Sequence, residues 1–436
     1  MSKLTPAIIA DRVDHDVVVV GASLAGCTVA LLLARQGLRV AVIEQRADPA
    51  AFKRVCTHYI QSSAVPTLER LDLLDSIVAA GGVRSRTRVW THWGWMAPPA
   101  DTKLPENVNL RRELLDPLIR SAAAEQDGVE LILGHTVDRV LERDGAVAGV
   151  EAVAPDGSRL PITARLTIGA DGRHSTVARL AGVRTRSKEI GRFAYGGYYD
   201  GPPVGTAPDI TMWLLDPQWA AVLPTNAGLM TYACMPTLDR LPEFRRDPEA
   251  ALRTYFADLP NPPPIRESRL VEPLIGALKI PTMHRTTTAP GLALAGDAAM
   301  ASDPLWGVGC GWALQTGEWL ADSVGPALRG EQELGRGLAR YARVHRRSLR
   351  QHSLLIDSYS TGRRMNIGER TMFSAATRDP RLGELSAWFG ARHVKPTALL
   401  APGVLARGAA ANLRHAVGRS RVADPALAPA GLGPTG

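Results

Sequence analysis

The sequence predicts an α/β protein in which a parallel sheet carries a second, mixed α+β region and is followed by a helical C-terminal part. Residues 17–44 have the pattern strand, helix, strand, and such a unit requires parallel strands. Apolar runs at 166–169 and 292–295 are short enough to be further buried strands of that sheet. From about residue 311 onward the apolar spacing is helical.

Length and composition exclude several classes of protein. The 436 residues exceed what one compact core usually holds, so more than one domain is expected. The four cysteines form no CxxC pair, which disfavours a zinc ribbon or a disulfide framework and fits a reducing compartment. Residues 1–16 lack the apolar segment of a signal peptide, and the uncharged stretch 17–34 contains a glycine turn. We therefore expect a cytoplasmic protein without a transmembrane segment.

The net charge of +8 raises the question of a nucleic-acid partner. Only six of the 51 basic residues are lysine, and basic and acidic residues alternate without a basic run of five or more. This pattern disfavours nucleic-acid binding. The sequence leaves the oligomeric state open.

The first βαβ unit is followed by a regular series of expected elements. A strand at 17–20 leads into a turn, a helix at 27–36 that ends at Gly37, and a strand at 39–43. Further along we expect a helix over 63–80, an extended stretch over 83–95, a helix over 109–125, strands within 129–150 broken at Gly134 and at Asp144-Gly145, strands at 210–215 and 229–234 between Pro- and Gly-rich turns, and a disordered tail over 422–436.

The turn of the first unit carries the motif Gly21-x-Ser23-x-x-Gly26, and Glu44 ends the second strand. Gly21 permits a tight turn, a small residue at 23 lets the backbone approach a pyrophosphate, and Gly26 allows close helix–strand packing. Glu44 is placed to accept hydrogen bonds from a ribose. Because serine replaces the middle glycine, this motif alone is weak evidence.

Two further motifs follow apolar strands. One is Gly169-Ala-Asp171-Gly172, and the other is Gly296-Asp297-Ala-Ala with the loop Asp303 to Gly311. The second of these places a carboxylate at a strand end and a glycine-rich turn before a helix. Those are the groups needed to hold a polyol and to direct backbone N–H groups at an anionic ring.

Together these motifs resemble those of the FAD-dependent monooxygenases built like p-hydroxybenzoate hydroxylase, over about residues 15 to 325. The segment Asn109 to Asp116 adds a match to that family's arginine-initiated helix. The resemblance implies FAD as the cofactor, NAD(P)H as a transient reductant and a Rossmann-type fold. Two departures from the family are Met300, where many members have histidine, and Gly311, where many have asparagine.

The resemblance also assigns roles and boundaries. It implies cofactor contacts by Gly21, Ser23, Gly26, Glu44, Arg112, Asp171, Gly172, Asp297, Gly307, Gly309 and Gly311. It divides the chain into a discontinuous FAD-binding domain (15–82, 106–186, 286–330), a substrate domain (83–105, 187–285) and a C-terminal helical region (331–421).

The substrate cavity of the family lies between the extended stretch and the substrate domain. Residues 84–95 read as one strand, with His92 on one face and Trp93 on the other. We expect substrate contacts from His92, Trp213, Trp219, Tyr232 and Trp306, although rings such as Trp213, Trp219 and Tyr232 are more often part of the core.

The sequence thus predicts an FAD-dependent, NAD(P)H-consuming monooxygenase that hydroxylates or epoxidises a hydrophobic small molecule of specialised metabolism with O₂. No catalytic triad or metal cluster is evident, and none is needed, because the cofactor supplies the redox chemistry.

Three alternatives stay open. A flavin halogenase would carry a substrate-side lysine, yet Arg84 stands where we would look for it, and Trp93-Gly-Trp95 is only a near match to the halogenase signature. A reductase of the geranylgeranyl type shares the dinucleotide motif. A flavin-less binding protein on the same scaffold is the non-enzymatic alternative.

Overall fold

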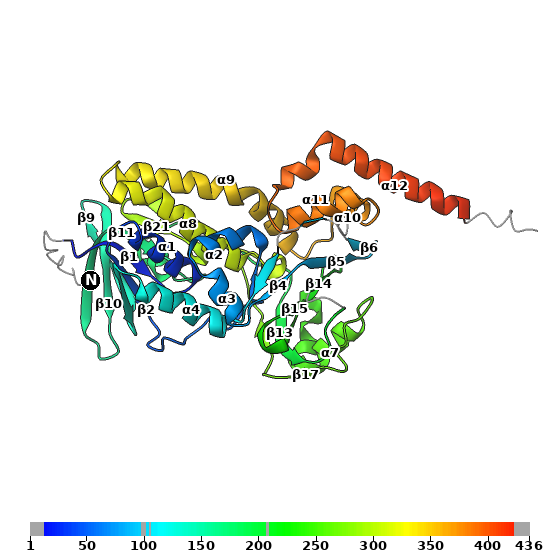
Figure 1. Cartoon of the computed structure of the whole chain (residues 1–436), viewed down its shortest axis with the longest axis horizontal. Coiled ribbons are helices and arrows are strands. Elements are labelled where there is room, and N and C mark those ends of the chain that lie inside the picture. Colours follow the sequence, from blue (N-terminus) through cyan, green and yellow to red (C-terminus); the bar gives the residue numbers. More distant parts are fainter. Residues whose placement is uncertain (1–12, 97–101, 104–105, 206–208, 423–436) are drawn as a thin grey trace, which may run out of the picture.

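The computed structural model describes residues 13–96, 102–103, 106–205 and 209–422. Two eight-stranded sheets dominate it, and a row of helices lies along one side of both (Figure 1). None of the described helices is long and apolar enough to cross a membrane. The α/β fold with a helical C-terminal part is confirmed.

The first sheet is built on the predicted parallel core. Its strand order is β20-β21-β11-β1-β2-β8, with the β9–β10 hairpin attached to β11. The strands are β1 (His15–Val20), β2 (Val40–Glu44), β8 (Val129–Leu133), β9 (Thr136–Arg143), β10 (Ala146–Val153), β11 (Arg159–Gly169), β20 (Thr288–Ala289) and β21 (Leu292–Leu294). Strands β8, β2, β1, β11 and β21 run parallel, so their carboxyl ends meet at one edge.

The central strands of this sheet are apolar on both faces, so both faces must be covered, and they are buried. One face packs against α1 (Leu24–Ala34), which lies between α4 (Arg112–Glu125) and α8 (Gly309–Leu328). The short α5 (Thr176–Leu180) packs against the β9–β10 hairpin on the other face. This layering directs the amino terminus of α1 toward the edge where the parallel strands end.

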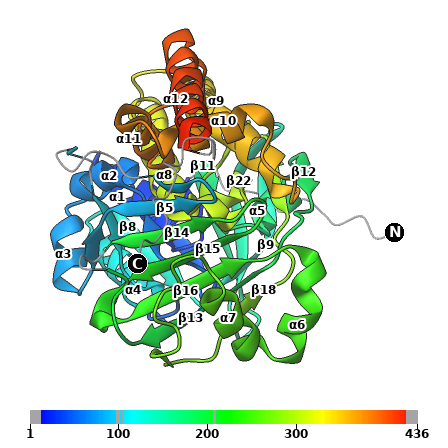
Figure 2. The same ribbon diagram turned by 90° about the vertical axis from the view of Figure 1, so that its right-hand side faces the viewer.

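The second sheet is mostly antiparallel and has the order β17-β13-β16-β15-β14-β5-β6, with β18 paired to β13 (Figure 2). Its strands are β5 (Thr87–Thr91), β6 (Gly94–Met96), β13 (Ala194–Asp200), β14 (Ile210–Leu214), β15 (Trp219–Pro224), β16 (Met230–Met235), β17 (Arg269–Leu270) and β18 (Ile275–Ala277). One face packs on α6 (Leu241–Arg246) and α7 (Pro248–Ala257), and the other faces the first sheet's carboxyl edge.

Short elements join the two sheets. One small sheet consists of β3 (Tyr59–Ile60), β4 (Val83–Ser85) and β7 (Asn107–Asn109), and another of β12 (Thr185–Lys188), β19 (Thr282–Arg285) and β22 (Met300–Ala301). The short helices are α2 (Val65–Arg70) and α3 (Leu74–Ala79). The described 3₁₀ turns are η1 (Ser62–Ala64), η2 (Asn226–Gly228), η3 (Leu238–Arg240), η4 (Gly296–Ala298), η5 (Pro304–Trp306) and η6 (Pro396–Leu400).

A buried ion pair also connects the second sheet to the loop after β22. Arg192, which precedes β13, binds Asp303 in the loop after β22, and neither side chain is exposed. The same guanidinium donates to the carbonyl of Tyr359 in α9 (Leu334–Ser360). The remaining helices are α10 (Ile367–Ala376), α11 (Pro380–Gly390) and α12 (Pro402–Val422).

Several expected elements have different bounds. Residues 84–95 are not one strand, because Gly94 adopts φ +123° and turns the chain into the β5–β6 hairpin, while β4 joins another sheet. The helix expected over 63–80 is split where Asp72 adopts φ +58°. The helix expected from residue 109 begins at Arg112, after β7. The disorder expected over 422–436 lies, apart from residue 422, outside the described residues.

Candidate active site

A cavity of about 920 Å³, the main cavity, opens between the carboxyl edge of the first sheet and the second sheet. The expected cofactor residues at its wall are Gly21, Ser23, Glu44, Arg112, Asp171, Gly172, Asp297, Gly307 and Gly309. Gly26 and Gly311 lie inside α1 and α8 instead. Four segments far apart in the chain therefore contribute to one site.

The glycine turn exposes backbone to this cavity. Gly21 adopts φ +105°, and a Cβ there would lie 2.6 Å from the carbonyl oxygen of Ala170. A Cβ at Gly26 would collide with the carbonyl oxygen of Gly21, so this glycine sets how closely α1 approaches β1. The amino terminus of α1 offers its free N–H groups to an anion, as a pyrophosphate requires.

Glu44 is fixed by the same turn. Its Oε2 accepts a hydrogen bond from the N–H of Ala22 at 3.0 Å, and its Oε1 accepts one from the backbone N–H of Arg46 at 3.1 Å. The carboxylate thus ends β2 at the cavity wall while its two oxygens keep further lone pairs for donors.

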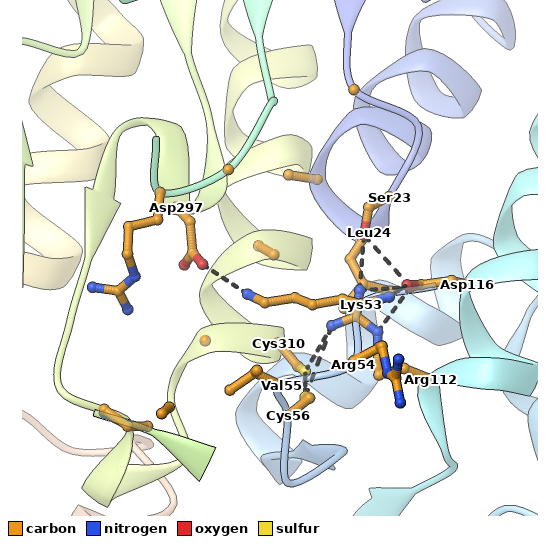
Figure 3. A pocket seen from close by; sticks show the side chains of 18 of the residues that line it. Ser23, Leu24, Lys53, Arg54, Val55, Cys56, Arg112, Asp116, Asp297 and Cys310 are labelled. Atoms are coloured by element: carbon orange, nitrogen blue, oxygen red, sulfur yellow. Dashed lines mark hydrogen bonds and ion pairs between the residues drawn. The ribbon is translucent and has the colours of Figure 1, made fainter. Parts of the chain in front are cut away.

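Arg112 lies at the start of α4 in a buried network (Figure 3). Its guanidinium donates to Asp116 Oδ1 at 2.5 Å and to Ser23 Oγ at 2.8 Å. The charge expected to pair with a phosphate is therefore already balanced by Asp116. Asp116 also accepts from the N–H of Lys53 at 2.9 Å, which ties α1, α4 and the loop after β2 together.

Lys53 and Asp297 bond to each other at the cavity wall, as Figure 3 shows. The Nζ of Lys53 lies 2.9 Å from Oδ2 of Asp297. Burial alone would raise the pKa of Asp297, but the ammonium group holds that pKa below its usual value. The pairing in turn raises the pKa of Lys53. Both groups are charged near neutral pH.

Two thiols lie beside Arg112. The sulfurs of Cys56 and Cys310 are 3.5 Å apart, and the Arg112 guanidinium lies 3.8 Å from each. A hydrogen bond from Cys310 holds the pKa of Cys56 well below its usual value, although burial opposes the shift. The same bond and burial raise the pKa of Cys310. Cys56 is thus the more acidic thiol of the pair.

His58 links this cluster to the second sheet. Its Nδ1 accepts a hydrogen bond from the N–H of Arg112 at 3.0 Å, so the ring proton lies on Nε2 when the ring is neutral. Nε2 lies 2.6 Å from the hydroxyl of Tyr198. His58 is therefore a hydrogen-bonding bridge.

The cavity residues that sequence reasoning missed include Lys53, Cys56, Asp116 and Arg120. Arg120 donates to the carbonyls of Ala22 and Ala51 and so braces the glycine turn. A signal for Lys53 existed: it is one of only six lysines in an arginine-rich chain. The others required knowledge of which segments meet.

The five expected substrate contacts separate into three places. Trp213 and Tyr232 lie in the core between the second sheet and α7, because alternate residues of a strand point to opposite faces. His92 is exposed at the β5–β6 turn against Trp93. Among the described residues, none of these three lines the main cavity, whose wall at this sheet comes from neighbours such as Thr231 and Ala233.

Trp219 and Trp306 line a second, smaller cavity of about 90 Å³ between the second sheet and α11. Tyr59 borders both cavities. Its hydroxyl donates to Asn107 at 3.1 Å, and its ring packs against Gly307, where a Cβ would collide with it. Tyr59 therefore stands between the two spaces.

The residues at the wall of the main cavity fit a dinucleotide cofactor. Asp171 donates nothing and accepts only through Oδ2, from the N–H of Val177, while its Oδ1 is buried without a partner within the described chain. A buried carboxylate oxygen without a donor is costly unless a ligand supplies one. The cradle at Gly21, the carboxylate of Glu44 and this unpaired oxygen all match a polyol and pyrophosphate ligand.

Comparison with known proteins agrees with this reading. A family model described as an FAD binding domain matches residues 14–352. A menaquinone reductase of Mycolicibacterium smegmatis is 31% identical over 332 residues, which are 70% of this chain and 75% of the relative. A 3-(3-hydroxy-phenyl)propionate/3-hydroxycinnamic acid hydroxylase of a Mycobacterium species is also 31% identical, but over 41% of this chain and only 32% of the hydroxylase.

Solved structures show the same fold. The flavin-dependent brominase Bmp2 superposes with a TM-score of 0.73 and 16% sequence identity, over 94% of this chain and all of the brominase. At that identity the likeness concerns the fold alone.

Proposed function

The chain belongs to the FAD-binding-domain family and is an FAD-dependent oxidoreductase, and on that premise we propose that it is an NAD(P)H-consuming monooxygenase acting on a hydrophobic small molecule. One observation carries the proposal. The main cavity continues from the cofactor residues onto the second sheet, where the aliphatic residues Ala194, Ala233, Ile275 and Ala277 line it beside Tyr198 and Thr231. Ile280, in the loop after β18, extends the aliphatic part of this wall. Cofactor and substrate would share one enclosed space.

The chain's own residues would bind and orient the cofactor. Bound FAD would accept hydride from NAD(P)H and activate O₂. Glu44 would accept hydrogen bonds from the ribose, and the amino terminus of α1 would face the pyrophosphate. Asp297 would hold the polyol chain, with Lys53 fixing its charge.

The substrate side would exclude water. The aliphatic residues of β13, β16 and β18 offer few groups that could hydrogen-bond a solvent molecule, and Tyr59 closes the path to the small cavity. An oxygen-activating site needs such a dry wall, because water promotes loss of the activated oxygen as hydrogen peroxide. The apolar wall would select a hydrophobic substrate by burial.

A halogenase is a weaker reading. Arg84 lies on β4, paired with Glu106, and does not line the main cavity in the described structure. Lys53 and Lys279 do line it, however, so the absence of a lysine at position 84 does not exclude halogenation. Chloride and bromide therefore belong in the activity test.

The second candidate is a flavin-dependent reductase of an isoprenoid-type double bond. It is favoured by the menaquinone reductase, whose match extends over three quarters of that relative, whereas the hydroxylase match covers a third. A reductase needs the same cofactor half and an apolar pocket, but no O₂.

Oxygen labelling distinguishes the candidates. The purified protein, loaded with FAD and NAD(P)H, would be incubated with hydrophobic candidates under ¹⁸O₂, and products would be analysed by mass spectrometry. We expect O₂-dependent turnover and one ¹⁸O atom in the product. Anaerobic turnover with reduction of a double bond would establish the reductase, and incorporation of halide would establish the halogenase.

A further inference from the structure

The outer face of α9 carries a stripe of arginines. Six exposed arginines lie on this one helix, and no acidic residue occurs between Glu333 and Asp357. They are Arg336, Arg340, Arg343, Arg346, Arg347 and Arg350. At 3.6 residues per turn, all but Arg346 fall within an arc of about 80° and along roughly 21 Å of helix.

This stripe is opposite the buried face of the helix. Leu338, Tyr341 and Leu349 pack inward, where α9 lies on α8. The arginines therefore point away from the body of the protein. Within the described chain, none of the six guanidinium groups forms a hydrogen bond or ion pair with another group. Five unpaired charges of one sign on one face, with Arg346 beside them, attract an anionic partner.

Exposed leucines occur on α9 and on the elements that follow it. Leu354 follows the arginines one turn after Arg350, falls on the axis of the stripe and is 58% exposed. The turn η6 is bound to α9 by a hydrogen bond from Thr397 to Gln351 at 3.2 Å, and it presents Leu400, 65% exposed. Helix α12 then projects from this side of the molecule, with Leu413 66% exposed (Figures 1 and 2).

From this arrangement we propose that α9, η6 and α12 form a docking face for an anionic lipid surface. The arginines would contact phosphate head groups, each adding electrostatic attraction, while the leucines would enter the boundary between head groups and acyl chains. Nucleic acid offers phosphates but no apolar phase for Leu354, Leu400 and Leu413. A lipid surface satisfies both kinds of side chain.

The test uses the full-length, FAD-loaded protein and vesicle flotation. Vesicles of phosphatidylcholine alone are compared with vesicles of equal parts phosphatidylcholine and phosphatidylglycerol. The stripe variant is R340E/R343E/R347E. The matched control is R245E/R246E/R266E, which changes the net charge equally at exposed arginines without side-chain partners in the described structure. Arginine-to-glutamine versions at the same stripe positions provide a milder change.

We expect flotation with the anionic vesicles only, lost in high salt, and weakened at least about tenfold in the stripe variant but not in the control. Leu413→Trp should show a blue-shifted emission when anionic vesicles are added. Absence of flotation, or equal loss in both charge variants, would overturn the proposal. The proposal would also be overturned if the protein failed to bind vesicles but bound duplex DNA, or self-associated in sedimentation, in a way that the stripe variant abolished.

Discussion

Lys53 and Asp297, 244 residues apart in the chain, meet through a 2.9 Å ion pair at the wall of the main cavity. The pair joins the loop after β2 to the turn after β21, and both segments line the main cavity. A charge-assisted bond of this kind is stronger than a neutral one.

The first prediction concerns this pair. Asp297→Ala should lower FAD occupancy while leaving the fold intact, because the polyol chain loses its acceptor. Lys53→Met should leave the partly buried Asp297 without its nearest cation, so that the pKa of Asp297 rises. FAD affinity of that variant should then fall on mild acidification, where the wild type is unaffected. Fluorescence titration of apoprotein at mildly acidic and mildly alkaline pH measures both effects, and unchanged FAD affinity in Asp297→Ala would refute the assignment.

Glycine 21 allows a prediction with a matched control. Gly21 and Gly37 both adopt positive φ, but a Cβ at Gly21 would meet the Ala170 carbonyl, whereas nothing lies within 4 Å of one at Gly37. Gly37→Ala should cost about 1 kcal/mol of stability and keep FAD. Gly21→Ala should cost more and lose FAD, because the turn must move. Chemical denaturation measures the stability of the purified variants, and flavin absorbance measures their FAD content. Equal losses of stability and of FAD in the two variants would show that the collision at Gly21 has no effect beyond the strain of a positive φ.

The thiol pair predicts selective alkylation. Cys56 has a lowered pKa and lines the main cavity, whereas burial raises the pKa of Cys27 to about 12 and also raises that of Cys234. Iodoacetamide near neutral pH should therefore modify Cys56 at least about tenfold faster than either of those two. Cys310→Ala should slow the reaction, because it removes the thiol that donates to Cys56. Peptide mass spectrometry over time measures the rates; modification of Cys27 first would contradict the geometry.

Two buried histidines predict acid sensitivity. Burial lowers the pKa of His345 and of His352 to about 4. Both folded-state pKa values lie below the pKa of histidine in the unfolded chain, so the unfolded chain takes up protons first as the pH falls. The contribution of these histidines to the free energy of unfolding is therefore fully present above about pH 6.5. It should decline as the pH falls from there toward 4, by roughly 1–2 kcal/mol per histidine at pH 5. His345→Gln with His352→Gln should flatten this decline in chemical denaturation of the FAD-loaded protein, and a slope equal to that of the wild type would exclude these groups.

The part of the fold that the sequence predicts well is local. The βαβ unit could be read from β-branched runs, a glycine turn and Glu44, because all its determinants lie within one segment. The wall of the main cavity is different. The carboxylate of Asp116 accepts hydrogen bonds from the backbone N–H of Lys53 and the hydroxyl of Ser23, and no spacing in the sequence predicts these contacts.

Sequence alone did not distinguish residues of the second sheet that line a cavity from residues in its core, because the two alternate along each strand. Tyr232 and Ala233 are adjacent on β16, yet one packs on α7 and the other faces the main cavity. Sequence alone does not say which face of a sheet a helix will cover, so it does not show whether Tyr232 or Ala233 lines the cavity. The arginine stripe forms no contiguous basic run in the sequence, because its residues are spaced three and four apart and meet only on the surface of a helix.

The buried bond between Arg192 and Asp303 has a practical consequence for dissecting the enzyme. Residues 187–285 would retain Arg192 but lose Asp303 and the carbonyl of Tyr359, so the surface that these groups cover would be exposed with its cation unpaired. They would also lose β5, which pairs in parallel with β14 from more than a hundred residues earlier in the chain. A gene fragment for the second sheet would therefore yield an insoluble product, and chimeras that exchange substrate preference between relatives must carry three segments together: β5–β6, residues 187–285 and the Asp303 loop.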